Sequence, residues 1–316
     1  MPRTTARGAL ALLLSLILAA SAVAVASAGV DPRGPTPEQV AAAHQEREAT
    51  GVQAAEAQQV GGIVFPLIGK VVYRDDFGDA RGQGPHQGND IVAPRRTPVV
   101  AAEAGRVRWW RTSARAGCML YLYGTSGTTY LYIHLNNDRT LSNDNKAGCE
   151  LGPTYATRDN ARVEAGELIA WNGDSGDADG NPHLHFEVHP KGGDAVSPYA
   201  LLQAATHHLF PARIGKAAAV GLRGRATGAG GGELTLAVTA VRWWPGGRWT
   251  PLPERQVTVT VSPDTEVSGE LAAALAGEGA TALDTAVTIV TRSEPATAAQ
   301  LRGAAGALTA ARVRSG

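Results

Sequence analysis

Apolar and polar residues alternate along much of the chain, and glycine breaks the alternation at short intervals. A period of two between turn residues is typical of β-strands, because successive side chains point to opposite faces. The strands expected in the first part of the chain are residues 63–65, 71–73, 97–102, 105–110, 119–123, 128–134, 168–170 and 184–188. We expect them to form an antiparallel sheet, interrupted by a polar loop over 136–160 and closed by 198–202.

The C-terminal part repeats the alternation around glycine-rich turns at 230–232 and 245–247. The expected strands there are residues 234–238, 257–261 and 285–291. This pattern predicts a small all-β domain, a barrel or a sandwich, so the predicted fold class is mainly β. Trp243, Trp244 and Trp249 are interpreted as aromatic anchors of a hairpin, with a ligand-stacking face as the alternative.

The N-terminus has the layout of a cleavable secretory signal. Arg3 and Arg7 precede an apolar run over 9–20, and small residues end in Ala-Ser-Ala before Gly29. An uncleaved anchor is the alternative, but the apolar run is short for a span of about 20 residues. We therefore expect a secreted, extracytoplasmic protein of the cell wall or periplasm, with no membrane attachment after cleavage.

Composition and length agree with this organisation. A chain of 316 residues suggests about two domains, and 38 glycines with 5 % aromatic residues favour a loop-rich β protein. We expect a signal peptide over 1–28, an Ala/Gln/Glu-rich arm or helix over 29–60, a first β domain over 61–210, a linker over 211–215 and the small all-β domain over 216–316. The arm has too few apolar residues to pack alone, and we consider the hypothesis that it covers a cleft and keeps the protein latent.

The charge balance argues against nucleic acid as a partner. Lys+Arg and Asp+Glu both number 29, and removal of the signal takes away only two arginines. The chain therefore has no basic field with which to hold a polyanion.

The two cysteines, Cys118 and Cys149, are expected to form an intrachain disulfide in an oxidising compartment. The chain-entropy model gives a loop of about 30 residues a stabilisation of roughly 3–4 kcal/mol. The alternative, a pair of thiolate metal ligands, lacks any CxxC spacing.

Four of the eight histidines lie in three short motifs, two of which also supply an acidic residue. His86 and Asp90 lie four residues apart in PHQGND, His134 lies in YIHL, and His183 and His185 lie in HLHFEV. Strand alternation places His183, His185 and Glu187 on one face, with the intervening apolar residues on the other. Imidazole and carboxylate are the ligands of zinc, but each motif alone is equally an ordinary polar surface. Their combination is far more specific.

Together these segments resemble the LytM/lysostaphin-like zinc endopeptidases, which cut peptide cross-links in bacterial cell walls. The resemblance runs from about Val64 to Leu202. It is carried by Phe65-Pro66, His86–Ile91, Ala93-Pro94, Thr97–Val99, Ala101-Ala102, Gly105–Val107, Tyr132–Leu135, Gly173–Gly176 and His183–Val188.

The resemblance implies one zinc ion per chain, bound by His86, Asp90 and His185, within a peptidase domain over 61–210. It also implies two catalytic histidines, His134 and His183, one as general base and one stabilising the oxyanion or protonating the leaving amine. Three ligands leave the fourth tetrahedral position to water, as a catalytic zinc requires. The implied substrate is a peptidoglycan stem peptide or cross-bridge, and we expect a monomer.

Two features depart from the family pattern. Asn89 stands where a small apolar residue is common, and the segment between His134 and Val163 is longer than usual. Both lie beside the predicted site and remove no ligand, but they affect the shape of the substrate groove, and so the bond that is cut. The alternatives are a non-catalytic member that binds cell wall or activates another hydrolase, and a zinc peptidase of other exported proteins.

Overall fold

The computed structural model describes residues 62–82, 84–150, 154–268, 271–276 and 281–315. The expected signal peptide over 1–28 and the arm over 29–60 lie outside the described residues. Across these described ranges, every helix is too short or too polar to cross a membrane.

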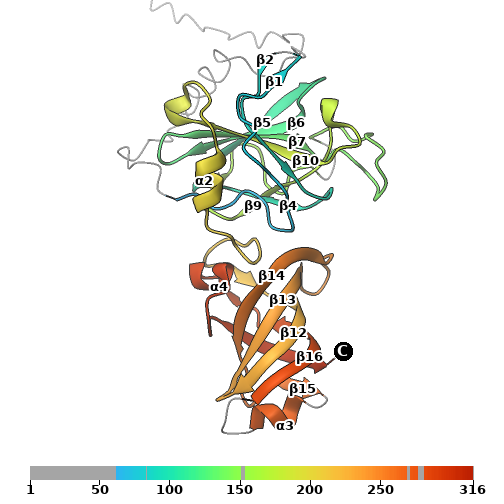
Figure 1. Cartoon of the computed structure of the whole chain (residues 1–316), viewed down its shortest axis with the longest axis vertical. Coiled ribbons are helices and arrows are strands. Elements are labelled where there is room, and N and C mark those ends of the chain that lie inside the picture. Colours follow the sequence, from blue (N-terminus) through green and yellow to red (C-terminus); the bar gives the residue numbers. More distant parts are fainter. Residues whose placement is uncertain (1–61, 83, 151–153, 269–270, 277–280, 316) are drawn as a thin grey trace, which may run out of the picture.

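The N-terminal unit is built on a six-stranded sheet, and the unit is shown in blue to yellow in the upper half of Figure 1. The strands of the whole unit are β1 (Ala80–Arg81), β2 (Gly84–Pro85), β3 (Asn89–Val92), β4 (Pro98–Val100), β5 (Gly105–Ser113), β6 (Gly117–Gly124), β7 (Thr129–Leu135), β8 (Arg162–Val163), β9 (Leu168–Trp171) and β10 (His183–His189). The large sheet has the order β3-β10-β7-β6-β5-β8, and each neighbouring pair is antiparallel. Short pairs β1–β2 and β4–β9 flank it. The predicted antiparallel sheet is therefore confirmed.

The core of this unit lies on both faces of the central strands. All residues of β6 and β7 are buried. Leu184, Phe186 and Val188 of β10 point into one core, with Tyr130 and Tyr132 of β7. On the other face, residues of β6 and β7 such as Tyr121 and Leu131 form a second cluster. This other face also carries the histidines of β10. In the β10–β7 register His185 lies opposite Ile133, and paired residues point to the same face of a sheet.

Some expected strands take another form. Residues 63–65 and 71–73 make only isolated bridges, Val64 to Thr206 and Val72 to Val92, because neither segment has a continuous partner strand. The expected strand over 97–102 narrows to β4. The closing segment is helix α2 (Tyr199–Ala204), and the short 3₁₀ turns are η1 (Gly176–Ala178) and η2 (Pro190–Gly192).

The predicted loop over 136–160 contains no named strand within its described residues. Tyr155 alone makes a bridge, to Ala170. The disulfide between Cys118 and Cys149 is present and ties this loop to β6, across Cα atoms 5.4 Å apart. The expected pairing is thus confirmed.

The C-terminal unit, orange and red in the lower half of Figure 1, is a barrel. Its elements are β11 (Ala217–Ala218), β12 (Val220–Gly230), β13 (Glu233–Trp243), β14 (Thr250–Thr260), β15 (Glu266–Ser268), α3 (Leu271–Ala276), β16 (Thr281–Thr291), β17 (Glu294–Pro295), α4 (Ala298–Arg302) and β18 (Leu308–Ser315). The order β14-β13-β12-β16-β18 closes on itself through a parallel β14–β18 pairing. Of the two expected architectures, the barrel is therefore the one formed.

The tryptophans of the β13–β14 hairpin are braced by arginines. The Arg242 guanidinium lies 4.9 Å from the Trp244 ring centroid and 4.7 Å from that of Trp249, and the Arg223 guanidinium lies 4.2 Å from Trp249. Such stacking stabilises the hairpin and supports the anchoring interpretation.

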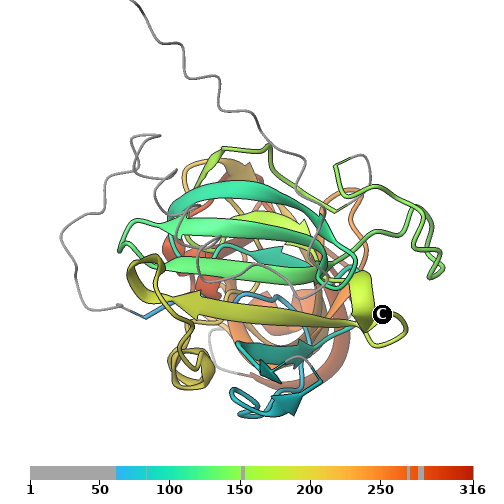
Figure 2. The same cartoon turned by 90° about the horizontal axis from the view of Figure 1, so that it is seen from above.

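An apolar contact joins the barrel to the N-terminal unit. Ile68, Val100 and Phe210 pack in the same buried cluster as the barrel strands. The Lys70 N–H donates to the Pro251 carbonyl over 3.0 Å. Seen from above in Figure 2, the large sheet lies over the barrel.

Candidate metal centre

Strand pairing brings two of the predicted metal ligands together. In the β3–β10 register, Asp90 lies directly opposite His185. His86 lies in the turn that leads into β3, and Gly88 lets that turn approach β10. A Cβ atom at Gly88 would come within 2.5 Å of the Phe186 carbonyl oxygen and 2.9 Å of His185 Nε2. The glycine in the motif is therefore required by this close contact.

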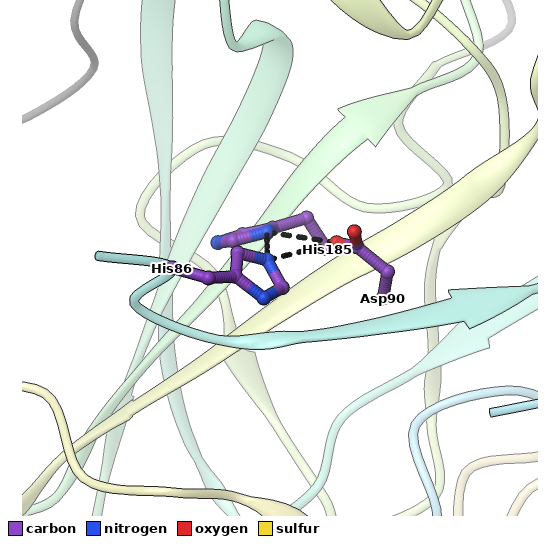
Figure 3. A group of neighbouring side chains, drawn as sticks. All are labelled: His86, Asp90 and His185. Atoms are coloured by element: carbon purple, nitrogen blue, oxygen red, sulfur yellow. Dashed lines mark hydrogen bonds and ion pairs between the residues drawn. The ribbon is translucent and has the colours of Figure 1, made fainter. Parts of the chain in front are cut away.

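The three side chains converge on one point, as Figure 3 shows. His86 Nε2 lies 3.1 Å from Asp90 Oδ1 and 2.9 Å from His185 Nδ1, and His185 Nδ1 lies 3.0 Å from the same carboxylate oxygen. A tetrahedral zinc with bonds of about 2.0–2.1 Å separates its ligand atoms by about 3.3 Å. The triangle is close to that size.

The second nitrogen of each ring is already engaged as a donor. His86 Nδ1–H donates to the Asp76 carbonyl oxygen over 2.8 Å, and His185 Nε2–H donates to Glu187 Oε1 over 2.9 Å. In these tautomers two ring lone pairs and a carboxylate oxygen face one another, so a cation, either a proton or a metal ion, is needed between them. The donor set and its orientation fit a zinc ion.

The electrostatics of this cluster favour positive charge. Burial opposes protonation of His185, but hydrogen bonds to Asp90 and Glu187 outweigh it and raise its pKa to about 9. Burial likewise opposes ionisation of Asp90, yet hydrogen bonds with His185 and His86 hold its pKa well below the usual range. The carboxylates that hold a proton on His185 would equally attract a divalent metal.

Asn89 has a structural role next to the ligands. Its side chain is fully buried and donates to the Arg74 carbonyl oxygen and to Asp76 Oδ1, over 2.5 and 2.7 Å. Asp76 is the residue whose carbonyl orients His86. The polar residue before Asp90 therefore fixes the segment that holds the first ligand, which explains this departure from the family pattern.

His134 and His183, predicted as catalytic, lie beside the cluster with ring centroids 4.8 Å apart. His134 Nδ1–H donates to the Ser175 carbonyl oxygen over 2.8 Å, and His183 Nδ1–H donates to that of Asn181 over 2.7 Å. With Nδ1 as the donor, each ring directs Nε2 toward the site. Burial first, and then the neighbouring histidines, lower the pKa of His134 to about 3.

The backbone of His134 is strained. Its φ of 63° is in the left-handed region, which costs a residue with a Cβ atom roughly 1–2 kcal/mol. Strain of this kind gathers at functional sites, where the surrounding structure holds it in place.

Glu187 and His189 also belong to the site, although the sequence pattern assigned neither of them a function. Glu187 is buried, accepts from His185 through Oε1, and accepts from His189 Nε2 through Oε2 over 2.7 Å. His189 Nδ1–H in turn donates to the Gly193 carbonyl oxygen over 2.8 Å. The strand alternation that places His183, His185 and Glu187 on one face extends to His189. This alternation is the feature of the sequence from which the hydrogen-bonded chain could have been predicted.

Fold and site together define an antiparallel β protein with a candidate His-Asp-His metal centre. Residues 84–198 match the model of Peptidase family M23. This stretch carries all five predicted site residues, and over this part of the chain the match agrees with the resemblance on which they were predicted. The family is one of metallopeptidases.

Solved structures give weaker likenesses. The catalytic domain of lysostaphin from Staphylococcus simulans is 23 % identical, over 43 % of this chain and 92 % of that chain, with a TM-score of 0.33. A putative glycyl-glycine endopeptidase LytM from Ruminococcus gnavus is 21 % identical, over 52 % and 67 %, with a TM-score of 0.36. A zinc-containing peptidase from Vibrio cholerae is 23 % identical, over 43 % and 39 %, with a TM-score of 0.33. No match is found among curated proteins.

Proposed function

We propose that the protein is an exported zinc endopeptidase that hydrolyses peptide bonds in peptidoglycan stem peptides or cross-bridges. The observation that carries this proposal is the triangle of His86 Nε2, Asp90 Oδ1 and His185 Nδ1, flanked by His134 and His183. Three inward-facing ligand atoms with two further imidazoles beside them are what metal-assisted peptide hydrolysis needs.

His86, Asp90 and His185 would hold one zinc ion. When bound, zinc lowers the pKa of a water molecule toward 7 and polarises the scissile carbonyl. Glu187 keeps His185 in the tautomer that presents Nδ1, and the Asp76 carbonyl does the same for His86 Nε2.

His134 and His183 move the protons. Each donates through Nδ1 to a backbone carbonyl, so its Nε2 can accept a proton from the attacking water or give one to the leaving amine. Burial lowers the pKa of His134, so the ring is neutral and its Nε2 lone pair is free at physiological pH. As in the sequence analysis, the two roles are assigned to the pair jointly.

The proposal extends to the organisation of the chain. We place a signal peptide over 1–28, the arm over 29–60, the peptidase domain over 61–210, the linker over 211–215 and the small all-β domain over 216–316. The disulfide between Cys118 and Cys149 supports an oxidising, extracytoplasmic location.

The test is digestion of purified peptidoglycan by residues 29–316, with chelator and with zinc added back, and mass spectrometry of the products. We expect chelator-sensitive release of peptides that carry a new amine, which identifies the bond. His86→Ala should lose zinc and activity together, whereas His134→Ala should keep zinc and lose activity. His207→Ala, an exposed histidine outside the site, is the control and should cleave like the wild type.

The outcomes separate the alternatives. Normal hydrolysis by His134→Ala would overturn the assignment of that residue. A zinc-loaded protein that releases nothing from peptidoglycan but cleaves unfolded exported proteins would identify a general zinc peptidase. A protein that binds peptidoglycan without cleaving any peptide would be a non-catalytic member.

A further inference from the structure

A cavity of about 560 Å³ lies between the N-terminal unit and the barrel. One wall is the segment between β3 and β4 with Trp171, and the other is the β13–β14 hairpin. Aromatic side chains line it from both sides. They are Trp171, Phe210, Trp243 and Trp249. Two of the three hairpin tryptophans, Trp243 and Trp249, therefore border an open space.

The charge of this cavity is one-sided. Its basic lining residues are Lys70, Arg95, Arg96, Arg242 and Arg248, and its described lining includes no carboxylate. Arg95 faces Asp138 and Asp174, and Arg96 donates to backbone carbonyls of the polar loop. Lys70 and Arg248 are exposed, and neither forms an ion pair with any residue that the structure describes. The cavity thus offers two cations to an anionic ligand.

A second groove, of about 580 Å³, borders this cavity on the side of the β3–β10 pair. It shares Lys70 and Pro94 with the cavity. Its far end is Pro182, the neighbour of His183 in the chain, and Val92, the partner of His183 in the β3–β10 register.

The groove leaves apolar side chains in water. Val72 is 73 % exposed and Val92 is 44 % exposed, although both are large aliphatic residues. Apart from Lys70, the described side chains of the groove are aliphatic or proline: Val71, Val72, Val92, Ala93, Pro94, Pro182 and Pro253. Such a surface can cover aliphatic side chains, but it has no groups to replace the hydrogen bonds of sugar hydroxyls with water.

We propose that the groove and the cavity form a second substrate site that binds an acidic peptide. The occupant is the carboxylate-bearing part of the same peptide whose scissile bond lies at the metal centre. Its aliphatic side chains lie along Val72 and Val92, and its carboxylates pair with Lys70 and Arg248 beside the indoles of the cavity. The identity of the peptide as a peptidoglycan stem rests on the proposed function, whereas its charge and polarity follow from the lining.

Binding can be measured without turnover in the His134→Ala form of residues 29–316. The probes are a synthetic stem tetrapeptide with free carboxylates, the same peptide with its carboxylates amidated, and peptide-free glycan, each titrated by calorimetry. We expect the double variant Lys70→Glu/Arg248→Glu to weaken binding of the free peptide at least tenfold and to leave the amidated peptide nearly unchanged. Lys216→Glu, an exposed lysine outside the cavity, should bind like its parent.

A kinetic arm separates this inference from the proposed function. On a cross-linked acidic substrate, the double variant in the otherwise wild-type chain should raise KM with kcat preserved. Equal affinity of the double variant and its parent for the free peptide would overturn the second site, even if the enzyme cleaves peptidoglycan. Competition by the glycan at the same site would overturn the choice of a peptide. If the wild type does not hydrolyse the substrate, the proposed function is overturned. A binding affinity that depends on the carboxylates of the peptide would still support the second site.

Discussion

Replacing Glu187 by Gln tests whether the hydrogen-bonded chain behind His185 sets the affinity of the metal centre. Glu187 is buried and accepts from both His185 and His189, over 2.9 and 2.7 Å. Burial opposes its ionisation, but these two hydrogen bonds outweigh it and lower its pKa to about 2. At neutral pH it is therefore an anion with both oxygens occupied by donors.

Glutamine has nearly the same shape but only one acceptor oxygen. Its NH₂ group must face an N–H of one of the two histidines, so one charge-assisted hydrogen bond is lost. Such a bond contributes about 1.5–3 kcal/mol. If the hydrogen bond to His185 is the one that is lost, nothing holds the His185 ring in the tautomer that presents Nδ1 to the metal. At about 1.4 kcal/mol for each factor of ten, zinc affinity should fall roughly 10- to 100-fold.

The assay is competition for zinc between Glu187→Gln and a chelating dye, together with a denaturation curve of each metal-free protein. The matched control is Glu103→Gln, whose carboxylate accepts from the Ser126 N–H and the Tyr130 hydroxyl at the other end of β7. This control should lose stability and keep wild-type zinc affinity. A folded Glu187→Gln protein that binds zinc as tightly as the wild type would refute the reasoning.

Three further predictions follow from the described residues. His134→Gly should be more stable than His134→Ala by about 1 kcal/mol in urea denaturation, because glycine relieves the positive φ of 63°; equal stabilities would show that no strain is stored there. The pKa of His134 falls from 6.5 to about 3 on folding, so as the pH drops the unfolded chain binds a proton at this residue before the folded protein does. Below pH 6.5, the metal-free wild type should therefore lose about 1.4 kcal/mol of folding stability per pH unit relative to His134→Ala. Parallel plots of stability against pH for the two proteins would contradict this. Cys118→Ser/Cys149→Ser should lower the free energy of unfolding by about 3–4 kcal/mol, as read from chemical denaturation, and an unchanged value would argue against a constraint on the loop.

Much of the fold could be predicted because strand alternation is a local property. Every strand of the large sheet except the short β3 and β8 was expected near its actual position, and the inward residues Leu184 and Phe186 pack in the core. The misassigned segments, 63–65 and 71–73, have the same local pattern but lack a continuous partner strand. A partner is a tertiary property that local alternation does not contain.

The candidate site divides in the same way. Residue types and spacing picked out His86, Asp90, His134, His183 and His185, and the structure brings all five together. The roles of Asn89 and Asp76 could not be predicted from the sequence. Their hydrogen bonds join segments that come together only when the turn before β3 has folded.

The sequence by itself determined the strand pattern, the cysteine pair and the positions of the histidine and carboxylate motifs, because these depend on residue type and on distance along the chain. Only the tertiary structure decided that the C-terminal strands close into a barrel, since closure needs β14 and β18 to pair across about fifty residues of chain. It also decided that Trp243 and Trp249 face Trp171 across a cavity. Contacts between residues far apart in sequence arise only when two units pack, and no local pattern specifies which surfaces will meet.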